Sequence, residues 1–262
     1  MKIRKFAMML SLSAVLGLTA CGSDDSNPAS DGGVSGSNSP LMLESSERRT
    51  DCYQDNAVGE LIDERDGQVY KTVKICDQVW MAENLNFDGP FSSRCFKGLS
   101  IEEDDHCRYG RHYTWEVVMD GAGIYSENGK GCGFGLVCSP VYPVRGICPE
   151  GWHIPTSAEW DTLYLATGKY PQDLMAQDQF NWPYATNISG FSALPAGLFH
   201  PTHGDYEYVL LYAGFWSASE YDSQIAYSFN LSDNSRAGHF NIGSNRMGKD
   251  YGWSVRCLQD SK

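Results

Sequence analysis

The sequence predicts an α+β domain with two or three short helices, small antiparallel sheets and long disulfide-bonded loops. Residues 148–160 contain the signals of a capped helix start, and residues 251–257 alternate apolar and polar side chains as a half-buried strand does. Eight further cysteines follow Cys21, which lies directly after an export signal. Cysteines open the first segment and close the second, so a bond between them would tie the helical half of the domain to its last strand.

The main helix is expected to begin at Ser157. Thr156 can cap its first turn, and Glu159, three residues after Thr156, completes a capping box. Gly168 is a stop signal after the last periodic residue. One face of this helix carries Trp160, Leu163 and Tyr164. The segment is therefore predicted to be a short amphipathic helix packed on a core.

The remaining elements are shorter. A hairpin is expected from residues 68–75 and 78–81, which are rich in strand formers and turn at 76–77. Helical spacing predicts a helix at 114–119, and a third is expected at 171–177. Further short strands are predicted at 193–198, 215–218, 225–231, 238–242 and 253–258. In the strand at 225–231, apolar residues alternate, so Ser228 and Asn230 should face outward.

The N-terminus carries an export signal. Basic residues precede an apolar run, residues 6–18, that is too short to span a bilayer, and Leu-Thr-Ala-Cys follows at 18–21. This pattern is the bacterial lipobox, which predicts a signal peptide at 1–20 and acylation of Cys21. The alternative is an ordinary signal peptide that leaves Cys21 as a free thiol.

The segment after Cys21 is predicted to be a flexible tether. Residues 22–40 are mostly Ser, Asp, Asn, Gly and Pro and cannot bury much surface, so we assign 21–50 as a lipid-anchored linker and 51–262 as one domain. The aspartates at 24 and 25 resemble an acidic surface-export signal of Gram-negative lipoproteins. The expected location is the outer membrane, at the cell surface.

The chain is acidic, with a net charge of −13. Such a charge repels nucleic acid and anionic lipid headgroups, so no nucleic-acid partner is expected, and it suits neutral or cationic ligands. The alternative is that the charge only keeps an exported protein soluble.

Several specific sequence motifs occur in order along the chain. They are Asp-Gly-Gln-Val-Tyr-Lys-Thr at 66–72, Trp-Met-Ala-Glu-Asn-Leu-Asn at 80–86, Cys-Pro-Glu-Gly-Trp-His-Ile-Pro-Thr at 148–156, Phe-Ser-Ala-Leu-Pro-Ala-Gly at 191–197, Phe-Trp-Ser-Ala-Ser-Glu-Tyr at 215–221 and Ser-Val-Arg-Cys-Leu at 254–258. From about residue 61 to 258 the chain therefore resembles the Fibrobacter succinogenes major paralogous domain. That family is similar to the C-type lectin-like fold of the formylglycine-generating, sulfatase-modifying enzymes. The resemblance implies that fold and no defined activity.

An even number of cysteines in an exported domain predicts disulfides. Zinc binding is the rival interpretation, but no CxxC pair occurs, and the pair His200 and His203 is isolated in the sequence. The resemblance to the family implies the pairs Cys95–Cys107, Cys132–Cys138 and Cys148–Cys257, which leaves Cys52 and Cys76 to pair. Cys76 stands where the family has glycine, so this last bridge would be a local addition.

No catalytic residue, metal or cofactor is predicted. The formylglycine-generating enzymes need reactive cysteines, and here all eight are expected to be paired. Hydrolysis would need paired carboxylates or a Ser/His/Asp set. Glu150, His153, Glu159 and Asp161 are close in sequence, but Glu159 is explained as a capping residue and His153 as packing beneath the helix.

A binding surface is the preferred hypothesis. Amides, hydroxyls and an aromatic ring are concentrated in turns between the late strands, and such side chains can stack on and hydrogen-bond to sugars. The candidate residues are Tyr221, Asp222, Asn230, Ser232, Asn234, Arg236, His239 and Asn241. The loop after Asn230 is expected beside Tyr221 and Asp222. The alternative is that these residues only form turns. Calcium ligation by Asp222, Asp233 and Asn234 is not favoured, because no lectin calcium signature occurs.

The sequence therefore predicts a lipid-anchored surface protein that binds polysaccharide or another surface component. Its partners are the membrane, through the lipid, and this ligand, while the oligomeric state is unknown. A structural envelope component without a soluble ligand is the first alternative. A redox enzyme related to the formylglycine-generating enzymes is the second.

Overall fold

The computed structural model describes residues 50–53, 58–95, 107–168, 170–177, 179, 181–234 and 239–261, and only the backbone at 50–51, 233–234 and 239–242. These residues fall within one compact unit, Glu44–Lys262. The expected signal peptide, Cys21 and most of the linker lie outside the described residues. None of the helices in the described part of the chain has the length and apolar character needed to cross a membrane.

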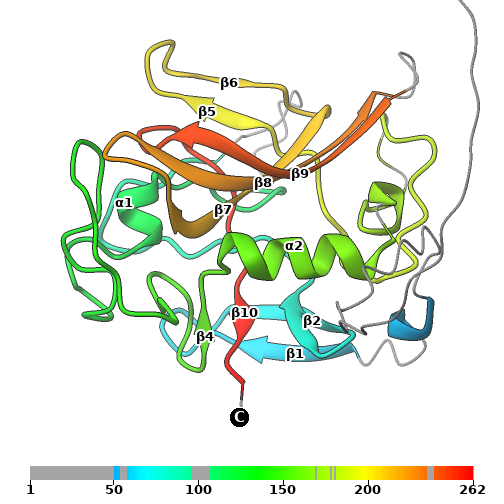
Figure 1. The fold of residues 1–262 in the computed structure, drawn as a ribbon, viewed down its shortest axis with the longest axis horizontal. Helices are drawn as coiled ribbons and strands as arrows, with labels where there is room; N and C mark the ends of the chain where they lie inside the picture. Colours follow the sequence, from blue (N-terminus) through cyan, green and yellow to red (C-terminus); the bar gives the residue numbers. More distant parts are fainter. Residues whose placement is uncertain are drawn as a thin grey trace, which may run out of the picture. The chain divides into compact units, whose positions relative to one another are not determined.

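The described residues form three small antiparallel sheets (Figure 1). The first has the order β1-β2-β3-β10-β4, with β1 Val58–Ile62, β2 Val69–Ile75, β3 Gln78–Met81, β4 Trp152–His153 and β10 Leu258–Gln259. The second is the hairpin of β5 Leu198–His200 and β6 Asp205–Glu207. The third has the order β7-β8-β9, with β7 Tyr212–Glu220, β8 Ile225–Asn234 and β9 His239–Gly248. The helices are α1 Trp115–Val118 and α2 Ser157–Ala166, with 3₁₀ turns at Thr50–Tyr53 and Pro171–Asp173. The predicted α+β class is confirmed.

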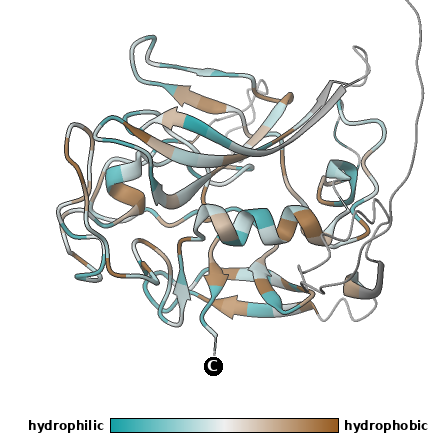
Figure 2. Cartoon of the chain, viewed as in Figure 1, coloured by the Kyte–Doolittle hydropathy of each residue, from teal (hydrophilic) through white to brown (hydrophobic). Residues whose placement is uncertain are grey.

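Helix α2 lies between the five-stranded and the three-stranded sheets (Figure 1). Hydrophobic and hydrophilic residues alternate along it (Figure 2), and its apolar face carries Trp160, which is fully buried. The Trp160 ring lies 4.6 Å from that of Trp80 in β3 and 4.7 Å from that of Phe229 in β8. A single side chain therefore joins both sheets through the helix.

The predicted helix start is confirmed. The Thr156 hydroxyl accepts a hydrogen bond from the Glu159 backbone N–H at 3.3 Å, and the Glu159 carboxylate accepts one from the Thr156 N–H at 2.8 Å. Both bonds satisfy backbone donors that the first helical turn leaves unpaired. Gly168 has a φ of +58°, as expected just beyond a helix end.

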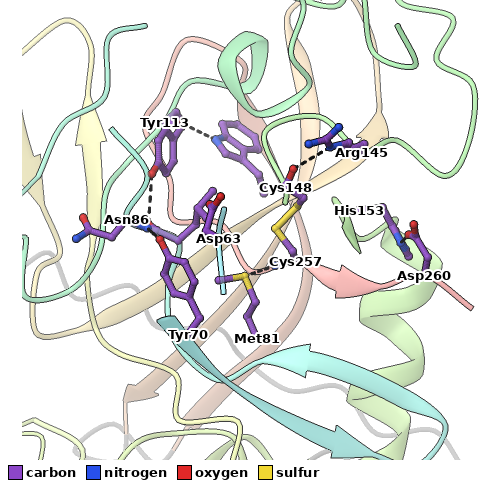
Figure 3. Close-up of a disulfide and its surroundings, with 12 residues drawn as sticks. Asp63, Tyr70, Met81, Asn86, Tyr113, Arg145, Cys148, His153, Cys257 and Asp260 are labelled. Carbon is purple, nitrogen blue, oxygen red and sulfur yellow. Dashed lines mark hydrogen bonds and ion pairs between the residues drawn. A yellow bond between two sulfur atoms is a disulfide. The ribbon is translucent and has the colours of Figure 1, made fainter. Parts of the chain in front are cut away.

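The described residues contain the three disulfides implied by the family resemblance and the fourth that pairs the two remaining cysteines. They are Cys52–Cys76, Cys95–Cys107, Cys132–Cys138 and Cys148–Cys257. Cys76 adopts a φ of +51° in the turn between β2 and β3, a backbone conformation that glycine adopts more readily. The glycine that the family resemblance implies for this position would adopt this conformation without strain. Figure 3 shows the Cys148–Cys257 bond, which ties the chain before α2 to the residue that directly precedes β10.

The half-buried strand predicted at 253–258 is wrong in two respects. Only Leu258 and Gln259 form a strand, and Ser254 and Arg256 are as fully buried as the apolar residues between them. This segment passes between the two clusters of the core: Trp253 and Val255 pack in one cluster, while the Arg256 guanidinium lies 4.5 Å from the ring of Phe191 in the other. The polar side chains of this alternating segment therefore form a second buried face and not a solvent-exposed one.

Two buried cations hold loops onto this frame. The Arg256 guanidinium donates to the Asn84 Oδ1 at 2.8 Å and to the Ser192 carbonyl at 2.8 Å. The Lys249 ammonium is paired with the Glu220 carboxylate and donates to the Leu136 carbonyl at 2.9 Å. A buried charge is costly without partners, and these hydrogen bonds and the ion pair offset that cost for both cations.

Candidate functional site

The structure does not bring the residues of the predicted binding surface together. Tyr221 and Asp222 lie in the β7–β8 turn, whereas the residues after Asn230 approach the β8–β9 turn at the opposite end of β8. Strand β8 has ten residues at about 3.3 Å per residue, so the two ends are about 30 Å apart. The expectation that they lie side by side is wrong, because consecutive antiparallel hairpins place their turns at alternate ends of the sheet. The calcium set that combines Asp222 with Asp233 and Asn234 is separated in the same way.

The residues at the first end have structural partners. The Asp222 carboxylate accepts from the backbone N–H groups of Gln224 at 2.7 Å and Ile225 at 2.8 Å, as a turn-forming aspartate does. Tyr221 is about half exposed, and the Arg246 guanidinium lies 4.4 Å from its ring centre. Asp222 is therefore explained by the turn, while Tyr221 remains an exposed aromatic surface.

At the second end, the backbone register pairs Asn234 with His239 and Ser232 with Asn241. Arg236 lies outside the described residues. Ser228 and Ser232 are buried, which contradicts the expectation that Ser228 faces solvent, because the second face of β8 is also covered by the core. The Asn230 Oδ1 and the hydroxyls of both serines have no hydrogen-bond partner within the described residues.

The acidic and histidine side chains near the start of α2 form a structural link. The His153 Nδ1 lies 2.6 Å from the Asp260 carboxylate, and its Nε2 lies 3.1 Å from that of Glu159 (Figure 3 shows His153 and Asp260). Burial acts to lower the pKa of His153, but hydrogen bonds to the two carboxylates outweigh it and raise the pKa. The pKa of Glu159 is lowered: burial opposes this shift, and hydrogen bonds from His153 and Thr156 outweigh it. This arrangement joins β4, α2 and the C-terminal segment, while Asp161 instead accepts from the Ser244 hydroxyl at 2.9 Å.

A pocket that no sequence motif indicated lies beside the β5–β6 hairpin. Its volume is about 180 Å³, and its lining combines hydroxyl, imidazole, guanidinium and carboxylate groups: Ser92, Arg94, His112, Thr114, Phe199, Pro201, Asp250 and Gly252. We refer to these eight residues as the hairpin pocket.

Isolated backbone bridges hold the walls of the hairpin pocket. Arg94 and His112 exchange two hydrogen bonds, of 3.0 and 2.6 Å, and Phe199 and Gly252 exchange two of 2.9 and 3.0 Å. A Cβ atom on Gly252 would lie 2.9 Å from the Phe199 Cβ, so the wall requires a glycine there. The Arg94 guanidinium lies 4.1 Å from the Phe199 ring centre, which couples the two bridges. Residues from four distant segments are therefore held in register by backbone bonds.

His112 contributes a neutral imidazole to the hairpin pocket. It is almost fully buried, and its Nε2 lies 3.2 Å from the Gly197 carbonyl, which can only accept. Burial lowers the pKa of His112 to about 4, although the carbonyls of Gly197 and Ala196 oppose the shift. The ring is therefore neutral near pH 7, with its proton on Nε2. Its Nδ1 is an acceptor that has no hydrogen-bond partner in the described part of the chain.

The arrangement provides both donors and acceptors. Thr114 is the N-cap residue of α1, yet its hydroxyl makes no capping hydrogen bond. Together with Arg94 as a donor and Asp250 as an acceptor, it gives the pocket the groups that bind a polar, hydroxyl-rich molecule. Sequence reasoning missed the pocket because its residues come from separate segments, and only the adjacent His200 and His203 had been noted.

Comparison with known families matches residues 73–259 to the Fibrobacter succinogenes major domain. No curated protein and no solved structure gives a significant match. The matched region covers more than half of the 262 residues and contains β3, α2 and the β7–β9 sheet. The chain therefore belongs to the Fibrobacter succinogenes major domain family.

Proposed function

We propose that this protein is a lipid-anchored component of the cell envelope whose domain binds a neutral, hydroxyl-rich ligand such as a polysaccharide, without catalysis. The observation that supports this function best is the hairpin pocket, whose lining combines the guanidinium of Arg94, the carboxylate of Asp250 and the hydroxyls of Ser92 and Thr114. Such groups can exchange hydrogen bonds with the hydroxyls of a neutral ligand. The proposed fold is lectin-like, in keeping with the small antiparallel sheets, the short helices and the disulfides.

Charge favours a neutral ligand over a polyanion. The chain carries a net charge of −13, and within the hairpin pocket the guanidinium of Arg94 is accompanied by the carboxylate of Asp250. An anionic polymer would meet repulsion from the whole protein with a single cation to offset it. A neutral polysaccharide avoids this repulsion and offers both donors and acceptors to the pocket.

Thiol chemistry is less favoured than binding. Each cysteine among the described residues belongs to a disulfide, so an oxidase like the formylglycine-generating enzymes would first need one of these bonds to be reduced. A structural envelope component without a soluble ligand remains the other class of function, and a binding measurement distinguishes it.

We expect the mature wild-type protein to be retained on at least one insoluble neutral polysaccharide in a pull-down assay. The triple variant Ser92→Ala, Thr114→Val, Asp250→Asn removes hydrogen-bonding groups from the pocket with little change in volume. Because each lost hydrogen bond contributes about 0.5 to 1.5 kcal/mol, retention should fall by about tenfold or more. The melting temperature should stay within a few degrees of the wild-type value.

The matched control is the pair Tyr221→Ala and Asn234→Ala, which changes residues at the two ends of β8 and leaves the hairpin pocket intact. This variant should be retained like the wild type. Loss of retention in the control alone would place the ligand at one end of β8 and not in the hairpin pocket. If the wild type were retained on no polysaccharide, the structural alternative would be preferred.

The proposed lipid anchor depends on Cys21, which lies outside the described residues. Replacing Cys21 by Ser should move the exported protein from the membrane fraction to the soluble fraction, because the acyl chains attach to this thiol and to the amine that cleavage frees. The measurement is cell fractionation followed by immunoblotting, with Ser26→Ala, in the predicted linker, as the control variant. Equal membrane retention of wild type and Cys21→Ser would contradict the lipoprotein assignment.

A further inference from the structure

The β5–β6 hairpin brings together two histidines and a glutamate, His200, His203 and Glu207. Their potential ligand atoms all lie within 4.8 Å of one another. His200 ends β5, His203 lies in the turn, and Glu207 ends β6. The register pairs Leu198 with Glu207, and side chains alternate along a strand, so His200 and Glu207 share one face of the hairpin.

The side chains already contact one another. The His203 Nδ1 lies 2.6 Å from the Glu207 Oε1, and the rings of His200 and His203 stack with centres 4.0 Å apart. Two nitrogen ligands and one oxygen ligand therefore lie within 4.8 Å of one another. Because the lone pairs of stacked imidazoles lie in nearly parallel planes, one ring must rotate for both nitrogens to face the same ion. Sequence reasoning set His200 and His203 aside as isolated because it could not place Glu207 beside them.

We propose that His200, His203 and Glu207 form a binding site for a divalent transition metal, with Zn²⁺ as the ion that fits best. Two imidazoles and one carboxylate are a ligand set that Zn²⁺ accepts in tetrahedral geometry, with bonds of about 2.0 to 2.2 Å. Such bonds place ligand atoms about 3.3 Å apart, so the three groups must close by about 1.5 Å at most. The His203 side chain is 62% exposed and is free to make this movement. The fourth coordination position is left for water or for a ligand atom.

Tyr251 orients the first of these ligands. Its hydroxyl lies 2.9 Å from the His200 Nε2, and its ring centre lies 4.7 Å from that of His200. If Nε2 donates to this hydroxyl, Nδ1 carries the lone pair; it accepts a long hydrogen bond of 3.4 Å from the His203 backbone N–H, which the metal would replace. A hydrogen bond of this kind on the far nitrogen is the usual support of a metal-binding histidine. Tyr251 follows Asp250 of the hairpin pocket, so the same short segment serves both features.

A surface ion pair alone would not explain this arrangement. The His203–Glu207 contact, at this exposure, contributes at most about 1 kcal/mol and needs neither His200 nor Tyr251. Metal binding uses all four side chains. The site goes beyond the proposed function, since it requires no polysaccharide, and its test is independent of any ligand in the hairpin pocket.

The test is isothermal titration of the mature, untagged protein with Zn²⁺ alone, after treatment with a chelator. We expect saturable binding of one ion per chain. His203→Ala and Glu207→Gln should each weaken binding by about 100-fold or more, and Tyr251→Phe by about tenfold, because the hydroxyl acts through His200. Glu60→Gln, which removes an exposed carboxylate from β1, should leave the affinity unchanged.

A second readout is the visible absorption spectrum of the protein with one equivalent of Co²⁺, in which tetrahedral coordination gives strong bands. These bands should be absent in His203→Ala, and rescue should be seen in His203→Cys, which restores a ligand. His203 is exposed, so its variants test the site without unfolding the protein. Absence of saturable Zn²⁺ binding to the wild type, or equal affinities for the wild type and the His203→Ala variant, would overturn the proposal.

Discussion

Replacing Arg256 by Met is expected to lower the free energy of unfolding by about 3 kcal/mol or more. The guanidinium is fully buried. It donates to the Asn84 side-chain oxygen and to the backbone carbonyls of Met81, Phe191 and Ser192. Each buried acceptor that loses its donor costs about 1 to 3 kcal/mol, and methionine can replace the packing but none of these bonds. Relief of a desolvated charge offsets only part of this loss.

The aromatic surroundings of Arg256 add to the effect. Its guanidinium lies 4.5 Å from the ring centre of Phe191 and 5.4 Å from that of Phe215. Burial lowers the pKa of Arg256 to about 9, while the charge of Glu83 opposes the shift, so the group stays protonated near pH 7. We therefore expect Arg256→Lys to be destabilised as well, because an ammonium cannot donate to all four acceptors at once.

Urea unfolding of the two Arg256 variants, beside the wild type, measures this difference. Arg108→Met is the matched control, since Arg108 is exposed and should change stability by less than about 0.5 kcal/mol. A loss below about 1 kcal/mol in Arg256→Met would mean that the carbonyl bonds barely outweigh the cost of burying the charge.

Removing the Cys148–Cys257 disulfide should be the most destabilising change among the four bonds. Its cysteines are 109 residues apart, and restriction of the unfolded chain by such a loop is worth about 4.8 kcal/mol in the chain-entropy description. The double variant with alanine at both positions is expected to show this loss in calorimetric or denaturant unfolding. The same segment also carries Arg256, so the last strand would lose its covalent link while it keeps its polar one.

The internal comparison is the Cys95–Cys107 bond, whose cysteines are 12 residues apart and which therefore closes a much shorter loop. The same description assigns it about 2.8 kcal/mol, so removing it should cost about 2 kcal/mol less than removing Cys148–Cys257. Equal losses for the two double variants would show that loop length does not determine the contribution of these bonds.

Local signals in the sequence predicted local structure well. The capping box of Thr156 and Glu159 sets the start of α2 through bonds within one turn, so no distant residue is needed to recognise it. The hairpin of β2 and β3 is likewise encoded by strand formers on either side of a short turn. The family resemblance implied the class of fold and three of the four disulfide pairs, and Cys52–Cys76 joins the two cysteines that were left.

Tertiary structure decided the burial of polar residues and the composition of the sites. The alternation around Arg256 is that of a half-exposed strand, yet a second part of the core covers its polar face, which a pattern of period two cannot reveal. In the same way, the turns of β8 lie at opposite ends of the strand, so residues that are neighbours in sequence do not form one surface. His112 and Asp250, and His200 and Glu207, are brought together only by bridges between distant segments or by the register of a hairpin. The sequence by itself therefore determined the helix, the turns and the class of fold, because these depend on neighbouring residues, whereas only long-range packing decided where polar atoms meet.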